Sequence, residues 1–343
     1  MTFDPDAAVV PGAGVFGLPT TRNEASIVLI PVPFEATTSY GGGTEHGPDA
    51  IRTASVQVDL HDRRFGPIWR QGIFMEPEDA RFRLWGREAR EHARRIIERG
   101  SAGPGDEESV GHVDTAGSRM NALVAERVFA ALDEGRVPGV IGGEHSVSYG
   151  AIRACAERWG EIGVLQIDAH MDLRDRFEGF RWSHASVMFN VLEDEPRVTR
   201  VVQVGIRDFG EREEVYANRQ SGDDRRVVVH YDDDLFDRLA SGRSFAKRCR
   251  RIVEALPERV YITFDIDALD PALCPHTGTP VPGGLSWREV SLLLATLAAS
   301  GRRIVGFDLV EVAPGPDGDE WDANVGARVL YRLCGVVGQS PAQ

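Results

Sequence analysis

The sequence predicts an α/β fold with three layers, in which helices cover both faces of a mostly parallel sheet. Short apolar runs with the composition of buried strands alternate with amphipathic segments of helical spacing along most of the chain. Acidic residues and histidines follow directly after several of the apolar runs. In such sheets the functional site forms at the carboxyl ends of the strands, so the second observation supports the first.

Composition excludes several classes of protein. A hydrophobic content of 42% and a charged content of 27% in 343 residues are ordinary for a globular enzyme. No window approaches about 18 consecutive apolar residues, and Asp4 and Asp6 replace the basic start of a signal peptide, so we expect no membrane partner. The net charge of -14 argues against nucleic acid and favours a cationic substrate. The four scattered cysteines predict reduced thiols in a cytoplasmic protein.

The first third of the chain predicts an arm, a strand and helices. Residues 1–25 are rich in Pro and Gly and are expected to form a surface arm, followed by one domain over residues 26–338. Ile27–Val32 is the first predicted strand, and Pro48 suits the first turn of a helix. A helical and loop insertion is expected at about 77–120. It consists of helices at Glu76–Arg99 and from Thr115 to Gly135. The loop expected between them includes Gly100–Gly111 and a solvated His112.

The remaining two thirds continue the alternation. Ser286 and Glu289 have the spacing of a capping box and predict the start of a helix. The other predicted strands are Val137–Ile141, Val164–Ile167, Val201–Ile206, Val227–Val229, Val260–Phe264 and Arg303–Val312, and the other predicted helices are Val147–Arg158, Phe236–Leu256 and Ala327–Leu333.

The segment DAHMD follows the apolar run Val164–Ile167 and carries Asp168, His170 and Asp172. In an extended backbone, side chains two and four residues apart point to the same side. Two carboxylates and an imidazole on one side require a cation, because the carboxylates would otherwise repel each other. The alternative for this spacing alone is a polar loop in which the histidine is capped by a backbone carbonyl.

Two further strand ends repeat this design. Asp265 and Asp267 follow the strand before DIDALDP, and His145 follows Gly142 and Gly143, which are expected to form a tight turn with positive φ. So many carboxylates exceed the needs of one cation and suit a pair of divalent ions. Oxygen-rich ligation with a minority of imidazole favours Mn²⁺ over Zn²⁺.

The motifs GGEHS, DAHMD, SHAS and DIDALDP, in this order, resemble those of the ureohydrolase family of arginases and agmatinases. The stretch Ile30–Gly41 and the motif at 172–175 are most similar to the agmatinase branch, and the resemblance covers roughly Ile27 to Leu333. It implies an arginase/deacetylase-like fold, two Mn²⁺ per subunit with Ni²⁺ as the alternative, and a homotrimer or homohexamer.

The resemblance also implies a role for each site residue. Asp168 and Asp265 would bridge both ions, with Asp172 also accepting a hydrogen bond from the tetrahedral intermediate. His184, in SHAS, would bind substrate and shuttle protons, and Glu311 would pair with the substrate guanidinium. The implied metal ligands are His145, Asp168, His170, Asp172, Asp265 and Asp267. Without the resemblance, His184 could be a buried structural histidine and Glu311 an exposed residue at a strand end.

The implied reaction cleaves a guanidinium C–N bond and releases urea and an amine. Agmatine, which would give putrescine, is the expected substrate. Arg174 occupies a position where arginases have an Asn that reads the amino acid head group, and it is a candidate substrate-binding residue. Guanidinobutyrate, guanidine, methylated guanidines, formiminoglutamate and arginine remain alternatives, because their hydrolases share the same metal motifs.

Two other classes of protein are compatible with parts of the pattern. A zinc-dependent amide deacetylase shares the overall fold but uses one metal and fewer ligands, so metal content per subunit separates the two. A catalytically silent assembly subunit need not keep His145, His184 and Glu311 together. A urea-release assay separates it from an enzyme.

Overall fold

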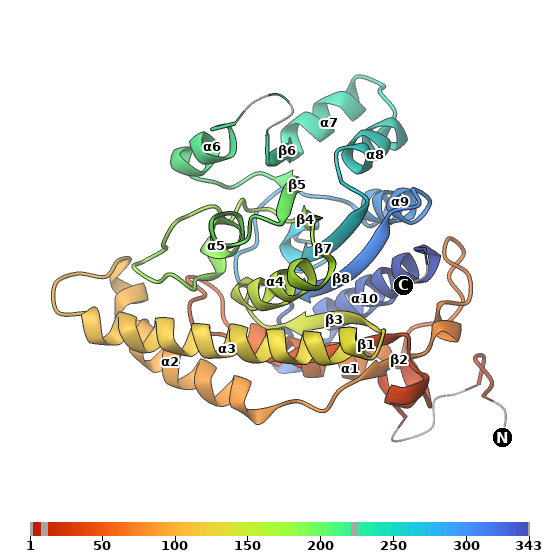
Figure 1. The fold of residues 1–343 in the computed structure, drawn as a ribbon, viewed down its shortest axis with the longest axis horizontal. Helices are drawn as coiled ribbons and strands as arrows, with labels where there is room; N and C mark the ends of the chain where they lie inside the picture. The colour runs from red at the N-terminus through yellow and green to blue at the C-terminus, as the bar shows by residue number, and fades with distance from the viewer. Residues whose placement is uncertain (1–2, 8–12, 221, 223–224, 342–343) are drawn as a thin grey trace.

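The computed structural model describes residues 3–7, 13–220, 222 and 225–341. Within them a sheet of eight strands has the order β2-β1-β3-β8-β7-β4-β5-β6, and every neighbouring pair is parallel. Helices lie on both faces of this sheet (Figure 1). The predicted three-layer α/β fold is therefore confirmed. The strands are β1 Ile27–Val32, β2 Ile73–Met75, β3 Val137–Gly142, β4 Ile162–Ile167, β5 Val198–Ile206, β6 Val227–Tyr231, β7 Arg259–Asp265 and β8 Arg303–Val310.

The strands read as near-continuous apolar runs because both faces of the sheet are buried. In β1, Ile27 and Leu29 pack into one core, whereas Val28, Ile30 and Val32 pack into the other. The first core lies under α1 Gly47–Ser55, α7 Asp232–Ala240, α8 Phe245–Glu254, α9 Trp287–Ala298 and α10 Trp321–Gln339. The second lies under α2 Ala80–Arg99, α3 Glu107–Asp133, α4 Ser148–Trp159, α5 Val187–Asp194 and α6 Glu211–Ala217.

Several predicted helix boundaries are wrong. The expected helix Phe236–Leu256 is two helices, α7 and α8, because Gly242 between them adopts a left-handed backbone with φ 77°. Helix α3 begins at Glu107 instead of Thr115, with acidic residues in its first turn that favour a helix start. His112 consequently lies in a helix, where its ring stacks on His92 of α2 with centroids 4.3 Å apart. Helix α10 is longer than predicted at both ends.

The N-terminal stretch is only partly a surface arm. Val15, Phe16 and Leu18 are buried, and the backbone N–H of Phe16 donates to Oγ of Ser55 at 2.9 Å. The Phe16 ring also packs against that of Tyr331. Apolar side chains in a Pro- and Gly-rich segment therefore dock on the first core. Residues 1–2 and 8–12 of the predicted arm lie outside the described residues.

Helix α9 confirms the predicted capping box. The Ser286 side chain accepts a hydrogen bond from the backbone N–H of Glu289, whose carboxylate accepts from the backbone N–H of Ser286. Among the described residues no helix combines the length and the apolar character that crossing a membrane requires.

The sheet brings four strand ends together. Strands β3, β8, β7 and β4 are neighbours in that order at its centre, and all of them run in the same direction. His145, Glu311, Asp265 and Asp168 therefore leave the sheet at one edge, although up to 166 residues separate them in sequence. This is the edge at which ligands bind in open parallel sheets.

Candidate metal centre and substrate pocket

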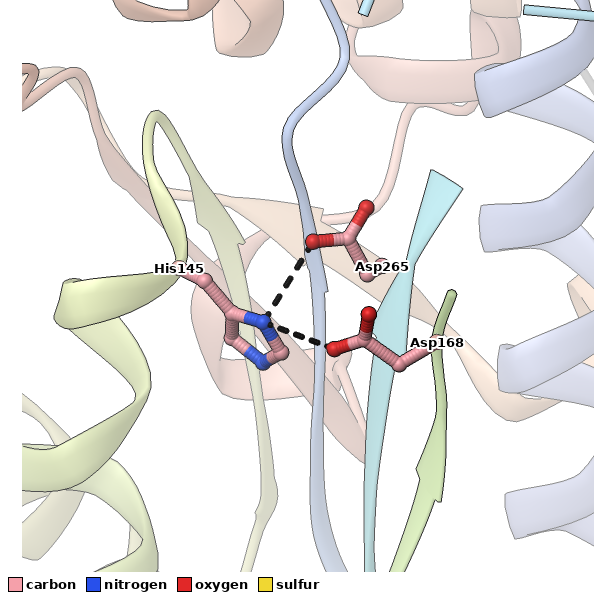
Figure 2. Close-up of side chains that lie close together, drawn as sticks. All are labelled: His145, Asp168 and Asp265. Carbon is pink, nitrogen blue, oxygen red and sulfur yellow. Dashed lines mark ion pairs between the residues drawn. The ribbon is translucent and has the colours of Figure 1, made fainter. Parts of the chain in front are cut away.

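The first candidate metal site surrounds His145. Its Nδ1 atom lies 3.2 Å from Asp168 Oδ2, 2.9 Å from Asp172 Oδ2 and 3.3 Å from Asp265 Oδ2. All four side chains are buried. Figure 2 shows His145, Asp168 and Asp265 pointing toward one another from three separate segments of the chain.

The second candidate site surrounds His170. Its Nδ1 atom lies 3.0 Å from Asp267 Oδ2 and 3.6 Å from Asp168 Oδ1. In each site a histidine and carboxylates offer ligand atoms within 4.8 Å of one another, and Asp168 belongs to both sites. Its two oxygens face the two histidines. Asp265 belongs to the first site only.

The DAHMD segment reaches this arrangement by a different backbone from the predicted one. Strand β4 ends at Ile167, and Asp172 has a left-handed backbone with φ 54° instead of an extended one. Glu311 shares this conformation, with φ 62°. Non-glycine residues held there cost of order 1–3 kcal/mol each and cluster at functional sites. Asp172 reaches the first site through this bend, and not through alternation along a strand.

The two glycines before His145 serve close packing and not a turn. Among the glycines described, those with positive φ do not include Gly142 or Gly143, so the predicted turn is wrong. A Cβ atom on Gly143 would lie 2.2 Å from the carbonyl oxygen of Phe34, and one on Gly142 would lie 2.6 Å from Val147 Cγ2. The absence of side chains lets the loop to His145 pass against Phe34, just after β1, and against Val310 of β8.

The electrostatics of the cluster fit a bound cation. Burial raises the pKa of Asp172 to about 7, with Asp168 adding to the shift, and burial together with Asp267 and Asp168 raises that of Asp265. Burial lowers the pKa of His145, but its three carboxylate neighbours reverse the shift and raise it. Burying several neighbouring carboxylates in their ionised form costs much free energy unless a positive charge lies beside them. Oxygen and imidazole donors suit Mn²⁺, and no cysteine contributes to either group in the described residues.

Several residues that hold the ligands were missed from the sequence. Nε2 of His145 lies 2.8 Å from Thr263 Oγ1, which donates to Asp308 Oδ1 at 2.7 Å. On the other side, Gln203 donates to Gln166 at 2.7 Å, and Gln166 donates to Asp168 Oδ2 at 2.8 Å. Such partners orient ligands and fix the imidazole tautomer. Polar residues inside otherwise apolar strands, as at Gln166, Thr263 and Asp308, are the signal that could have identified them.

His184 lies at the wall of a pocket beside the cluster. The pocket has a volume of about 280 Å³, and its wall includes His170, Asp172, Arg174, Phe177 and Asp208. Burial, followed by His170 and His145, lowers the pKa of His184 to about 3, so its imidazole is neutral near pH 7. His184 is 9% exposed, so it is buried as the alternative reading expected but also lines the pocket.

Glu311 is buried next to the cluster and is not an exposed strand end. Its Oε1 atom accepts a hydrogen bond from the backbone N–H of His145 at 2.7 Å. Its Oε2 atom is buried without a hydrogen-bond partner in the described structure, and the missing side chain of Gly278 leaves space beside it. A buried carboxylate oxygen without a partner is an acceptor available to a ligand.

Arg174 stands in the pocket wall with part of its guanidinium already engaged. Its Nε atom lies 3.2 Å from Glu213 Oε2, and the group sits over the Phe177 ring at 4.7 Å. Asp208 adds a carboxylate that is 70% exposed and lies 3.9 Å from His170. The outer pocket therefore presents one arginine and two carboxylates.

A known protein family matches most of this chain. The model of the Arginase family matches residues 25–335. The chain belongs to the arginase family. An N(1)-aminopropylagmatine ureohydrolase of Synechocystis is 31% identical over 330 residues, which cover 94% of this chain and 92% of that protein.

The solved structures of arginase-family proteins agree with this assignment. The agmatine ureohydrolase of Thermoplasma volcanium has a TM-score of 0.69 and 25% identity, with 99% of this chain and 96% of that one covered. The fold also matches Trypanosoma cruzi formiminoglutamase with Mn²⁺, with a TM-score of 0.70, 17% identity and coverage of 94% and 96%. This arginase-family chain is accordingly a ureohydrolase that acts on amidino C–N bonds, as predicted.

Proposed function

We propose that this ureohydrolase holds two divalent cations and cleaves the guanidinium group of agmatine or a closely related cation into urea and an amine. The observation that carries the proposal is the position of Asp168, whose two carboxylate oxygens face His145 and His170 in the two candidate metal sites. An ion in each site would share this carboxylate. The pair of ions would supply activation of a water molecule as a nucleophile at neutral pH.

The proposed ligand sets follow from the contacts. His145, Asp172 and Asp265 would hold the ion of the first site, and His170 and Asp267 that of the second, with Asp168 toward both. The bridging role that the resemblance implies for Asp265 stays a prediction. Backbone N–H groups help to orient these carboxylates: that of His170 donates to Asp168 at 2.6 Å, and that of Ala169 donates to Asp267 at 3.1 Å. Mn²⁺ is the proposed metal and Ni²⁺ the alternative.

Glu311 and His184 would act on the substrate. The unpartnered Oε2 atom of Glu311 would accept an N–H of the guanidinium, which places its carbon next to the candidate metal sites. Asp172 would accept a hydrogen bond from the tetrahedral intermediate. His184 would take up a proton that the attacking water molecule loses. As the C–N bond breaks, its electron pair moves onto the departing nitrogen, and His184 returns this proton to that nitrogen.

The charges of the outer pocket support a substrate with a cationic far end. Glu213 compensates the charge of Arg174, which leaves the exposed carboxylate of Asp208 to attract an ammonium group. Agmatine carries such a group, and so does its N1-aminopropyl derivative, the compound named for the Synechocystis relative. Both would react through the same guanidinium.

One observation favours a second candidate, a guanidino acid such as guanidinobutyrate. Arg174 engages Glu213 through Nε, and its two Nη atoms make no hydrogen bond to the described residues. A substrate carboxylate could bind this free edge of the guanidinium. Arg174 would then select the substrate and not merely shape the pocket wall.

Urea release tests the proposal directly. We expect the Mn²⁺-loaded or Ni²⁺-loaded enzyme to release urea from agmatine or aminopropylagmatine at a higher kcat/KM than from guanidinobutyrate, arginine, guanidine or formiminoglutamate. A preference for guanidinobutyrate would select the second candidate. No urea from any of these compounds would support a silent assembly subunit, and a single bound Zn²⁺ with amide hydrolysis would support a deacetylase. Sedimentation equilibrium tests the predicted homotrimer or homohexamer.

A further inference from the structure

The hydroxyl of Thr37 connects His184 to a buried carboxylate. Thr37 lies in the loop after β1, and its Oγ1 atom is 3.2 Å from Nδ1 of His184. The same oxygen is 3.1 Å from Glu144 Oε2 and accepts the backbone N–H of His184 at 3.1 Å. Thr37 is 1% exposed and Glu144 is fully buried, so water does not compete for these contacts.

The hydrogen bonds around Glu144 fix the direction in which Thr37 donates. Oε2 of Glu144 accepts the backbone N–H groups of Ala36 at 3.0 Å and Thr37 at 2.7 Å. Backbone N–H groups can only donate, so this oxygen is an acceptor. A proton on the carboxyl group would sit on Oε1, beside the hydroxyl of Ser146 at 2.7 Å. Oε2 therefore remains an acceptor whether or not Glu144 is ionised, and the single hydroxyl hydrogen of Thr37 goes to it.

This direction decides the tautomer of His184. Because the Thr37 hydroxyl hydrogen is used by Glu144, its oxygen can only accept from Nδ1 of His184, which must then carry a hydrogen. A neutral imidazole has one N–H, so Nε2 keeps its lone pair. In the described part of the chain Nε2 has no hydrogen-bond or ion-pair partner, and His184 lines the pocket.

We propose that Thr37 is a positioning residue. Its hydroxyl donates to Glu144 and accepts from Nδ1 of His184, which leaves Nε2 as the nitrogen that exchanges protons with the substrate. The inference rests on the proposed role of His184. The competing contact is Ser183, whose hydroxyl lies 3.4 Å from the same Nδ1 atom. If Ser183 donated there, the opposite tautomer would result.

The charges around His184 do not determine which of its two ring nitrogens carries the hydrogen. His170 and His145 face it from the candidate metal sites, Arg174 from the pocket wall and Arg90 from α2, and each of them disfavours a charged imidazole. They act on its charge but do not distinguish Nδ1 from Nε2. The contact with Thr37 does distinguish them, because it involves one nitrogen.

Substitution at Thr37 in the metal-loaded enzyme tests this hydrogen-bond relay, which runs from Glu144 through Thr37 to His184. We expect Thr37→Val to lower kcat for the best guanidine substrate about 10- to 100-fold, the usual range for loss of a partner that orients a functional side chain, with KM within about twofold of the wild type. Thr37→Ser keeps the hydroxyl and is expected to retain kcat within about threefold. Ser183→Ala removes the competing partner and should leave kcat within about twofold.

A double-mutant cycle separates positioning from general disruption. In a His184→Gln background, Thr37→Val should cost nothing further, because its effect passes through the imidazole. The proposal would be overturned if Thr37→Val kept full kcat or if Ser183→Ala lost much of it. It would also be overturned if the fold-losses of Thr37→Val and His184→Gln multiplied in the double variant. Metal content and the melting temperature verify folding, and Thr37→Ala replaces the valine variant if that variant misfolds. Failure of the wild type to release urea would refute the proposed function, and the relay with it, before any variant is compared.

Discussion

The backbone N–H of His145 donates a hydrogen bond to Oε1 of Glu311 at 2.7 Å, which ties a candidate metal ligand to the candidate guanidinium-binding carboxylate. The two residues follow neighbouring strands, β3 and β8. One oxygen of Glu311 is thereby fixed and the other is left buried without a partner among the described residues. The distance between the candidate metal and substrate subsites is thus set by the register of the sheet.

Replacement of Glu311 by Gln should separate substrate recognition from metal binding. The amide oxygen can still accept the N–H of His145, so we expect metal content to stay unchanged. Loss of a charge-assisted hydrogen bond worth about 1.5–3 kcal/mol should lower kcat/KM about 10- to 100-fold. Glu254→Gln, on the exposed face of α8, is the matched control and should match the wild type. Loss of metal together with activity would instead make Glu311 a structural support of the centre.

Replacement of Asp208 by Asn should test which charge the far end of the substrate carries. Because the side chain is 70% exposed, its attraction for an ammonium is worth less than about 1 kcal/mol, and KM for agmatine should rise about threefold. KM for guanidinobutyrate should fall, since a repulsive charge is removed. Asp237→Asn, exposed on α7, serves as the control. Equal changes for both substrates would exclude an electrostatic role.

His230 should make stability depend on pH in the acid range. Burial lowers its pKa to about 4 from the ordinary value of 6.5, with Arg248 and Arg238 adding to the shift. The unfolded chain therefore binds the extra proton between these values. The contribution of His230 is complete above pH 6.5 and is lost as the pH falls toward 4, by on the order of 3 kcal/mol.

Urea-induced unfolding at pH 7 and pH 4.5 measures this contribution. His230→Gln should lose less unfolding free energy between these two values than the wild type does. His46→Gln, at a histidine whose side chain is 54% exposed, should behave as the wild type. An unchanged pH dependence in His230→Gln would show that His230 is not the buried neutral group described.

The cap of α9 should contribute a measurable part of the stability. Ser286→Ala removes the side-chain acceptor of the Glu289 N–H and should lower the free energy of unfolding by about 1 kcal/mol without changing kcat. Ser244→Ala is the matched control, because Ser244 occupies the same position before α8 but its side chain makes no capping hydrogen bond. Equal losses in both variants would remove the specific role of the cap.

The sequence predicted the sheet and the convergence of the metal-ligand candidates because both depend on local patterns. Apolar runs define strands, and acidic residues at their ends define the edge where β4 and β7 meet. The left-handed backbone of Asp172 and the close packing of Gly143 depend on contacts with distant segments. The partnership of Thr37, Glu144 and His184 likewise joins three separate segments, and no spacing within one of them reveals it.

Helix boundaries failed for similar reasons. Amphipathic spacing runs through Gly242, and a left-handed glycine ends α7 without changing that spacing. The start of α3 at Glu107 is favoured by acidic residues that a loop would also accommodate. Strand β2 was not predicted, because its three residues are too few for a periodic pattern. Among the described strands it pairs only with β1.

Metal content per chain is the most direct test of the two-ion centre. After loading with Mn²⁺ and removal of free ions, elemental analysis of the active wild type should give two ions per chain. Asp168→Asn should lose metal and urea release together, because its carboxylate faces both candidate sites. Asp208→Asn should keep both ions. A fully active wild type with one ion per chain, or full turnover by Asp168→Asn, would contradict the account.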